Sequence, residues 1–182
     1  MIIAATDIAE AKIIDIEELR DERGFFARTW CQRELAAQEL CTEIAQESIS
    51  YNRKKATMRG LHYQRPPHGE VKIVRCLRGA IYDVIVDIRP QSPTFLKWQS
   101  FELTAANHRA LYVPDGCLHG FETLADETEV GYLISAFHVP EAAAGYRYND
   151  PAFAIAWPLA VEVISKRDRE WPDFKSAPAA RP

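Results

Sequence analysis

Residues 71–89 read VKIVRCLRGAIYDVIVDIR and contain two runs that are rich in β-branched and aromatic residues. Such runs are typical of β-strands, and the break LRGA between them contains the glycine that a tight hairpin turn favours. The stretch therefore predicts two consecutive antiparallel strands.

The same succession of short strand-like runs and turns continues along the chain. Further strands are predicted at residues 11–16, 23–30, 58–64, 98–103, 110–114, 117–124 and 129–137. A helix is predicted at 32–40, a loop with a short strand within 149–158, and a helical turn within 165–174. Strands that follow one another without alternating helices favour an antiparallel sandwich or barrel. We expect an all-β protein in which residues 1–182 form a single domain and about 176–182 are a frayed tail.

Two aspartates interrupt the apolar pattern of residues 80–89. One face of this strand is fully apolar, while the other alternates isoleucines with Asp83 and Asp87. Solvent is the default surrounding of such aspartates. Because the strand is otherwise apolar on both sides, we expect Asp83 to line a polar cavity instead.

The composition is that of an ordinary globular protein, with 47% hydrophobic and 26% charged residues and a net charge of −4. Mixed charges without a basic stripe disfavour nucleic-acid binding. Residues 1–24 have neither the basic start of a signal peptide nor the apolar run of a membrane span. The cysteines, Cys31, Cys41, Cys76 and Cys117, lack C-x-x-C spacing and predict reduced thiols in a cytoplasmic protein.

His62 and His119 lie in predicted strands and raise the question of a metal site. Residues 114–119, PDGCLH, have the P-x-G-x-x-H spacing of the second metal-ligand segment of cupin-type barrels. The first segment of such barrels has H-x-H, but here Gln64 stands in place of the second histidine. Lys72 would add a cation, which opposes the binding of a divalent metal. We therefore expect a cupin-like barrel that does not use metal.

A metal-free set of histidine, lysine, arginine, tyrosine and aspartate suits proton abstraction next to a ketone. Histidine has a pKa near neutrality and can serve as the base. The enolate oxygen needs a positive or hydrogen-bonding partner, such as Lys72 or a donor at a strand end. A tyrosine can protonate the opposite face, and a carboxylate would hold the histidine tautomer. The sequence leaves open which aspartate has this role.

Arg59 can join this set only if its strand is irregular. Arg59 and His62 are three residues apart, so on a regular strand they point to opposite faces. Gly60 offers a β-bulge that would bring both to one side. Without a bulge, Arg59 belongs to another surface.

Several motifs together resemble the dTDP-4-dehydrorhamnose 3,5-epimerases, the cofactor-free cupin enzymes of deoxysugar-nucleotide synthesis. The combination of RGLHYQ, DVIVDIR-x-x-SPT and P-x-G-x-x-HGF is specific to that family. The resembling segments run in order over nearly the whole chain, at residues 23–26, 59–67, 70–95, 111–121, 129–137, 148–158 and 164–168.

The resemblance implies a jelly-roll homodimer, with an N-terminal strand arm within residues 1–30 that contributes to the partner. It implies an isomerase that needs no cofactor or metal and inverts C3 and C5 of a nucleotide-linked 4-keto-6-deoxyhexose. By the resemblance, the catalytic residues are His62 as base, Asp168 holding it, Tyr132 as acid and Lys72 at the enolate oxygen. By the same resemblance, the substrate-binding residues are Arg23, Phe26, Arg59, Asp83 and His119, with Arg59 also at the diphosphate.

Two positions depart from the family pattern where the nucleotide base would sit. Arg28 stands in RGFFAR where the family often has glutamate, and His138 stands in AFHVPE where it often has tyrosine. Both are counted as substrate-binding residues. They leave the catalytic set intact but put the dTDP specificity in question.

Three other functions compete with the 3,5-epimerase hypothesis. One is a single-site 3- or 5-epimerase acting on a dTDP- or CDP-linked 4-keto sugar. Another is a non-catalytic cupin that binds a sugar nucleotide, which would be expected to have lost part of the catalytic set. The third, a metal-dependent cupin isomerase or oxygenase, is disfavoured by Gln64 and Lys72.

Overall fold

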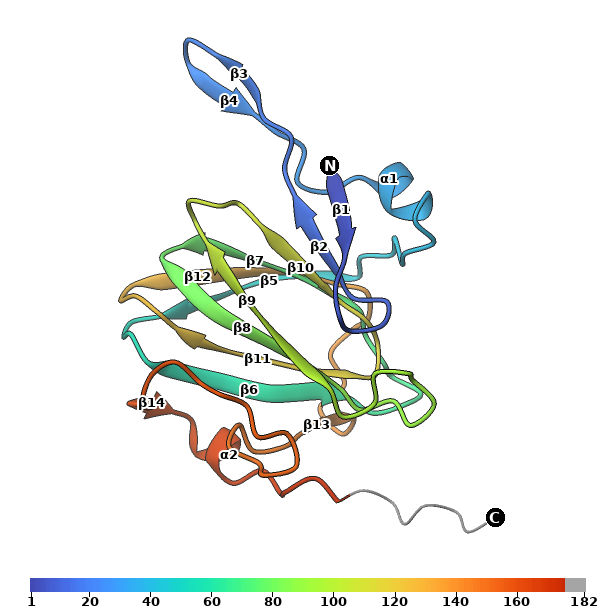
Figure 1. Cartoon of the computed structure of the whole chain (residues 1–182), viewed down its shortest axis with the longest axis vertical. Coiled ribbons are helices and arrows are strands. Elements are labelled where there is room, and N and C mark those ends of the chain that lie inside the picture. The colour runs from blue at the N-terminus through green and yellow to red at the C-terminus, as the bar shows by residue number, and fades with distance from the viewer. Residues whose placement is uncertain (176–182) are drawn as a thin grey trace.

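The computed structural model describes residues 1–175, so the tail predicted at 176–182 lies outside the described residues. Two antiparallel sheets face each other (Figure 1). The first has the order β1 (Ile2–Ala5), β2 (Lys12–Asp15), β10 (Ala110–Val113), β7 (Lys72–Arg78), β12 (Thr128–Ile134) and β5 (Gln46–Asn52). The second has the order β13 (Ala143–Gly145), β6 (Thr57–Gln64), β11 (Cys117–Thr123), β8 (Ala80–Asp87) and β9 (Trp98–Thr104), and β14 (Val163–Ile164) runs parallel to β6.

The remaining elements are a hairpin and two short helices. Strands β3 (Leu19–Asp21) and β4 (Gly24–Phe26) form a separate two-stranded sheet, and the helices are α1 (Gln32–Ala36) and α2 (Lys166–Arg169). The all-β prediction is confirmed. Within residues 1–175, no helix has the length and apolar character needed to cross a membrane.

The main core lies between the two sheets. The first sheet contributes side chains such as Val74, Leu111 and Val130, and the second contributes Ile85 and Phe121. The outer face of the first sheet is covered by the segment around α1, and that of the second by aromatic side chains from residues 146–174. Each sheet therefore contributes one face to the main core and packs its other face against a smaller apolar cluster.

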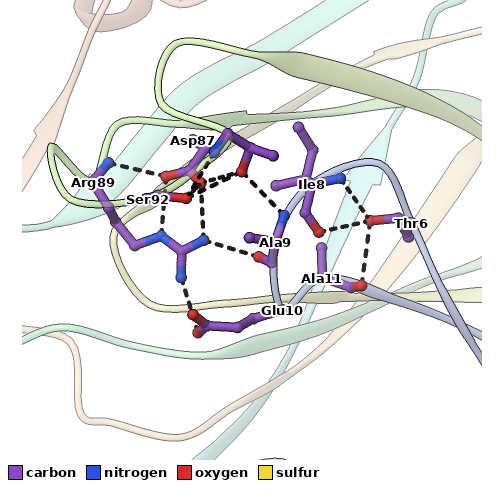
Figure 2. Close-up of polar contacts among 9 residues, drawn as sticks. Thr6, Ile8, Ala9, Glu10, Ala11, Asp87, Arg89 and Ser92 are labelled. Carbon is purple, nitrogen blue, oxygen red and sulfur yellow. Dashed lines mark hydrogen bonds and ion pairs between the residues drawn. The ribbon is translucent and has the colours of Figure 1, made fainter.

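Asp87 does not face solvent, which corrects the default expectation for this residue. Its side chain is fully buried and accepts hydrogen bonds from Arg89, from Ser92 and from Thr94 (2.6 Å), as Figure 2 shows in part. Arg89 also donates to the carbonyl of Ala9 at 2.9 Å. The buried carboxylate therefore ties the loop after β8 to the loop that joins β1 and β2.

This network predicts a stability that depends on pH. Burial alone would raise the pKa of Asp87, but the hydrogen bonds from Arg89, Ser92 and Thr94 outweigh it and lower the pKa to about 2. Since an unfolded aspartate titrates near pH 4, the stabilisation, about 2 kcal/mol, is present above that pH and is lost as the pH falls towards 2.

We expect Asp87→Asn to lower the free energy of unfolding by about 2 kcal/mol or more at neutral pH, because the variant lacks the carboxylate. The difference from the wild type should shrink as the pH falls from about 5 to about 2. Denaturant unfolding at a series of pH values measures it. A difference that stayed constant over that range would contradict the assignment.

The expected N-terminal arm divides into two parts. Strands β1 and β2 belong to the first sheet, whereas the β3–β4 hairpin projects away from both sheets (Figure 1). Leu19 and Phe26 on this hairpin are 69% and 71% exposed. Such exposure of large apolar side chains is unusual on a free surface and is typical of a segment that contacts another molecule.

Candidate active site

A bulge in β6 brings Arg59 and His62 to the same face of the sheet. His119 pairs with His62, and Phe121 pairs with Arg59, so two steps along β11 oppose three steps along β6. His119 and Phe121 share a face because they are two residues apart. The irregularity that Arg59 requires is therefore present.

Gly60 makes this bulge possible because it has no side chain. Its φ of 129° is rarely adopted by other residues, and a Cβ here would lie 2.6 Å from the Cα of Gly120. Glycine on both strands allows the two backbones to approach this closely. The direction of the Arg59 side chain thus depends on the Gly60–Gly120 contact.

His62 is paired with the carboxylate of Asp168. The His62 Nε2 lies 2.6 Å from Oδ1 of Asp168 on α2, and Gly60 N–H donates to Oδ2 at 3.4 Å. The Ser165 hydroxyl accepts from the Asp168 backbone N–H and caps this helix. Burial alone would raise the pKa of Asp168, but hydrogen bonds from His62 and Gly60 outweigh it and lower the pKa. The ionised carboxylate accepts a hydrogen bond from the Nε2–H group of His62, which leaves the Nδ1 lone pair free to act as a base.

Tyr132 approaches the same space from the opposite sheet. It lies on β12, and its hydroxyl is 3.1 Å from Oγ of Ser50 on β5. Burial raises the pKa of Tyr132, and the hydrogen bond to Ser50 opposes this only in part. The phenol is therefore protonated at neutral pH and can donate a proton.

A second histidine–carboxylate pair lies deeper between the sheets. The His119 Nε2 is 2.7 Å from Oδ1 of Asp83, and the two side chains are 6% and 0% exposed. Burial raises the pKa of Asp83, against the opposing effect of His119. The His62 side chain, by contrast, is 41% exposed. His62 is thus the histidine that a bound molecule can reach, while His119 and Asp83 form a polar floor beside Tyr132.

Lys72 reaches the interior from β7, next to a fixed carboxylate. Its Nζ lies 2.8 Å from Oε1 of Glu70, whose other oxygen accepts from Gln64 at 3.1 Å. The Gln64 amide also bonds backbone groups of the neighbouring loops. Gln64, at the position of a cupin metal ligand, is thus committed to bonds within the protein. In the described part of the chain, no group of three His, Cys, Asp or Glu side chains is arranged to hold a metal ion.

Two adjoining cavities meet at these groups. The inner one, about 480 Å³, lies between the sheets, and the outer one, about 560 Å³, extends along β14 and α2. The residues that line both are Arg59, His62, Lys72 and His138. The arrangement can hold an elongated anionic molecule, with its reacting end in the inner cavity between His62 and Tyr132.

Three expected substrate-binding residues do not reach these cavities within one chain. Arg23 and Phe26 lie on or beside the β3–β4 hairpin, and Figure 1 shows this hairpin at the opposite end of the molecule from α2. Arg23 pairs with Asp21, and Arg28 pairs with Glu34 at 2.9 Å. The structure therefore brings together the four catalytic candidates with Arg59, Asp83, His119 and His138, and leaves the hairpin residues apart.

Sequence reasoning missed several residues at this site. Ser50 and Asn52 come from β5, whose polar residues gave no strand signal. Arg167 lines the outer cavity and stacks over Trp171 at 5.0 Å, and the Trp171 ring meets His62 edge-on at 6.2 Å. The position of Arg167 next to Asp168 was the one available signal for its proximity to the site.

Known proteins match this chain over nearly its full length. The family model for dTDP-4-dehydrorhamnose 3,5-epimerase matches residues 5–176. A dTDP-4-dehydrorhamnose 3,5-epimerase of Sinorhizobium fredii is 36% identical over 181 residues, which cover 99% of this chain and 93% of that protein.

Solved structures agree with this match. The Bacillus anthracis dTDP-4-dehydrorhamnose 3,5-epimerase, with TDP and PPi bound, has a TM-score of 0.91 and 37% identity, over 94% of this chain and 98% of that chain. A 3'-monoepimerase from Streptomyces bikiniensis, in complex with dTDP-quinovose, has a TM-score of 0.86 and 30% identity, over 93% and 86% of the two chains. By fold and by sequence, the chain belongs to the dTDP-4-dehydrorhamnose 3,5-epimerase family of isomerases.

Proposed function

We propose that this protein inverts C3 and C5 of a dTDP-linked 4-keto-6-deoxyhexose and converts dTDP-4-dehydro-6-deoxy-D-glucose into dTDP-4-dehydro-L-rhamnose. The observation that carries the proposal is that His62 and Tyr132 enter one cavity from opposite sheets. A base and an acid on opposite sides of a sugar ring are what inversion at a carbon requires. Membership of the epimerase family supports the same substrate class.

In the first step, His62 removes a proton from a carbon next to the C4 ketone. The C–H electron pair moves into a C=C bond, and the carbonyl oxygen becomes an enolate oxygen. Asp168 stabilises the imidazolium that forms, since the carboxylate is already ionised and hydrogen-bonded to the ring. Lys72 lines the same cavity and stabilises the enolate oxygen.

In the second step, Tyr132 returns a proton to the opposite face of the same carbon, and the configuration inverts. The buried phenol is protonated at neutral pH and is suited to this donation. C3 and C5 both flank the C4 ketone, so the same base and acid serve both carbons when the ring presents each in turn. Asp83 and His119 complete the wall of the sugar site.

The nucleotide end of the substrate occupies the outer cavity. The diphosphate is recognised by Arg59, which lines both cavities and is held by a hydrogen bond to Asn52. Arg167 adds positive charge on the α2 side. His138 at the rim contacts the base end and contributes to the choice of nucleotide.

The partner chain of a homodimer supplies the remaining contacts. The hairpin residues Arg23, Phe26 and Arg28 lie far from their own cavity and are exposed, which suits insertion into the cavity of a second copy. Phe26 offers an aromatic face for stacking on the nucleobase. Arg23 offers a charged group for the nucleotide, and Arg28 contributes to the choice of nucleobase.

The cysteines bear on where the protein works. In the described part of the chain, Cys31, Cys41, Cys76 and Cys117 are free thiols. Free thiols without disulfides are the usual state in a reducing compartment. We therefore place the enzyme in the cytoplasm.

Solvent exchange tests the activity directly. The protein is incubated in D₂O with dTDP-, CDP-, UDP- and GDP-linked 4-keto-6-deoxyhexoses, without added metal or nicotinamide, and deuterium is located by NMR. We expect incorporation at both C3 and C5 of the dTDP-linked sugar. Incorporation at one carbon would establish a single-site epimerase. Faster exchange with a sugar linked to another nucleotide would change the proposed nucleobase. No exchange with any of the sugars would indicate a protein that binds sugar nucleotides without turnover. Loss of activity on chelation would contradict the metal-free mechanism.

Subunit complementation tests the shared site. Phe26→Ala is expected to raise KM roughly 10-fold with little change in kcat, since it removes a nucleotide contact and leaves the catalytic groups intact. His62→Ala removes the base. Mixed and re-equilibrated dimers of the two variants would contain one site with both an intact hairpin and an intact base. We expect part of the wild-type kcat/KM to return on mixing, whereas purely additive activities would show that the hairpin does not cross to the partner.

A further inference from the structure

A chain of hydrogen bonds connects Arg59 to Tyr132 through two residues of β5. Arg59 Nε donates to Oδ1 of Asn52 at 2.6 Å, and Asn52 Nδ2 donates to Oγ of Ser50 at 3.5 Å. Ser50 Oγ lies 3.1 Å from the Tyr132 hydroxyl. Asn52 is 2% exposed, so its amide is shielded from water.

Two neighbours fix the orientation of the Asn52 amide. The guanidinium of Arg59 can only donate, so the amide oxygen must face it. The backbone carbonyl of Thr128 can only accept, and it takes a hydrogen bond from Asn52 Nδ2 at 3.2 Å. The amide therefore presents its N–H groups to Ser50 and Thr128, and it cannot turn over without losing its hydrogen bonds with Arg59 and Thr128.

This orientation makes Ser50 the acceptor of the first hydrogen bond and favours Ser50 as the donor of the next. Since Ser50 Oγ accepts from Asn52, its own proton is available for the Tyr132 oxygen. When Tyr132 accepts that bond, the phenolic proton is free to point into the inner cavity. If the Ser50–Tyr132 hydrogen bond ran in the reverse direction, Tyr132 would donate its proton to Ser50 and could not donate it to a substrate.

We propose that Ser50 and Asn52 are positioning residues that make Tyr132 the proton donor of the site, because Arg59 and Thr128 fix the Asn52 amide so that the Ser50 proton is left for the Tyr132 oxygen. This inference rests on the proposed function of Tyr132 as the acid. The chain transmits hydrogen-bond direction and does not carry a proton. When the Tyr132 O–H bond breaks and a C–H bond forms, Ser50 stabilises the resulting tyrosinate, which then regains a proton from solvent.

The test separates inversion from exchange. In D₂O, His62 alone can remove a proton and return a deuteron to the same face, which gives labelled substrate without inversion. Inverted product requires Tyr132. We expect Ser50→Ala to raise the ratio of labelled, uninverted substrate to inverted product roughly 10-fold, because the tyrosinate loses its hydrogen bond. Asn52→Asp keeps the shape but cannot donate to Ser50, so the direction of the chain reverses and the same ratio rises.

Controls distinguish this role from a structural one. Ser50→Thr keeps the hydroxyl and should return the ratio to near the wild-type value. Ser48→Ala removes a hydroxyl from the same face of β5 without interrupting the chain, so its ratio should remain that of the wild type. Thermal unfolding verifies the folding of each variant.

The outcomes separate the two proposals. Equal loss of exchange and inversion in Ser50→Ala, or an equal rise of the ratio in Ser48→Ala, would overturn the positioning role while the epimerase function stands. Absence of exchange in the wild-type protein would instead remove the proposed function itself.

Discussion

Replacing His62 with alanine is expected to stop both solvent exchange and inversion, lowering each by roughly 10³-fold or more, because the variant lacks the base that removes the proton. Nucleotide binding should survive, since Arg59 and Lys72 line the same cavities and are unchanged. NMR exchange in D₂O measures the chemistry, and calorimetric titration with dTDP measures the binding.

Two further variants sharpen the assignment of the base. Asp168→Asn keeps the size of the side chain but removes the charge that fixes the His62 tautomer, and we expect a loss of roughly 100-fold. His68→Ala removes an exposed histidine in the turn after β6 and should leave activity unchanged. Normal turnover by both the His62 and the Asp168 variants would show that another pair performs the abstraction.

Replacing Tyr132 with phenylalanine is expected to give a different result, with proton exchange continuing while inversion falls by roughly 100- to 1000-fold. His62 can still remove the proton and return a deuteron from solvent to the same face, but the opposite face has lost its donor. The labelled substrate should therefore keep its original configuration. NMR coupling constants of the recovered sugar distinguish labelled substrate from inverted product.

The pH dependence of inversion tests the same assignment. Burial raises the pKa of Tyr132 above its ordinary value near 10, so the wild type should keep its acid across the neutral and mildly alkaline range. Inversion that persisted in Tyr132→Phe at the wild-type rate would show that the proton comes from another group.

Much of the fold follows from local pattern, and the errors have local causes. The runs at residues 71–77 and 80–89 are rich in β-branched and other apolar residues, and they form β7 and β8 almost as expected. The segment QESISYN gave no strand signal because it is polar, yet it forms β5 at the edge of the first sheet. An edge strand with exposed residues needs little hydrophobic pattern, since its partner supplies the backbone bonds. The strand expected within 149–158 was wrong, because that segment covers the second sheet as loops and turns.

The site shows a different limit of sequence reasoning. The apolar pattern of its strand indicated that Asp83 faces inward, and the alternation of side chains along a strand indicated that Arg59 needs a bulge at Gly60. Both features are present. Pairing across long separations could not be derived from local pattern. Asp168 follows His62 by 106 positions, and no spacing rule relates residues so far apart. Their contact was predicted from the resemblance to a family. The Ser50–Tyr132 contact depends on a strand that the pattern did not reveal.

The distance along the chain between His62 and Asp168 has a consequence for biosynthesis. During translation, all strands of both main sheets leave the ribosome before α2, and a product that ended before Ser165 would contain His62, Lys72 and Tyr132 without Asp168. Such a product could assemble the sandwich and still lack a fixed base. The residue that holds the base is thus made after every strand of the two main sheets. Incomplete chains would therefore lack the group that holds His62, and we expect them to turn over nucleotide sugar at least as slowly as Asp168→Asn.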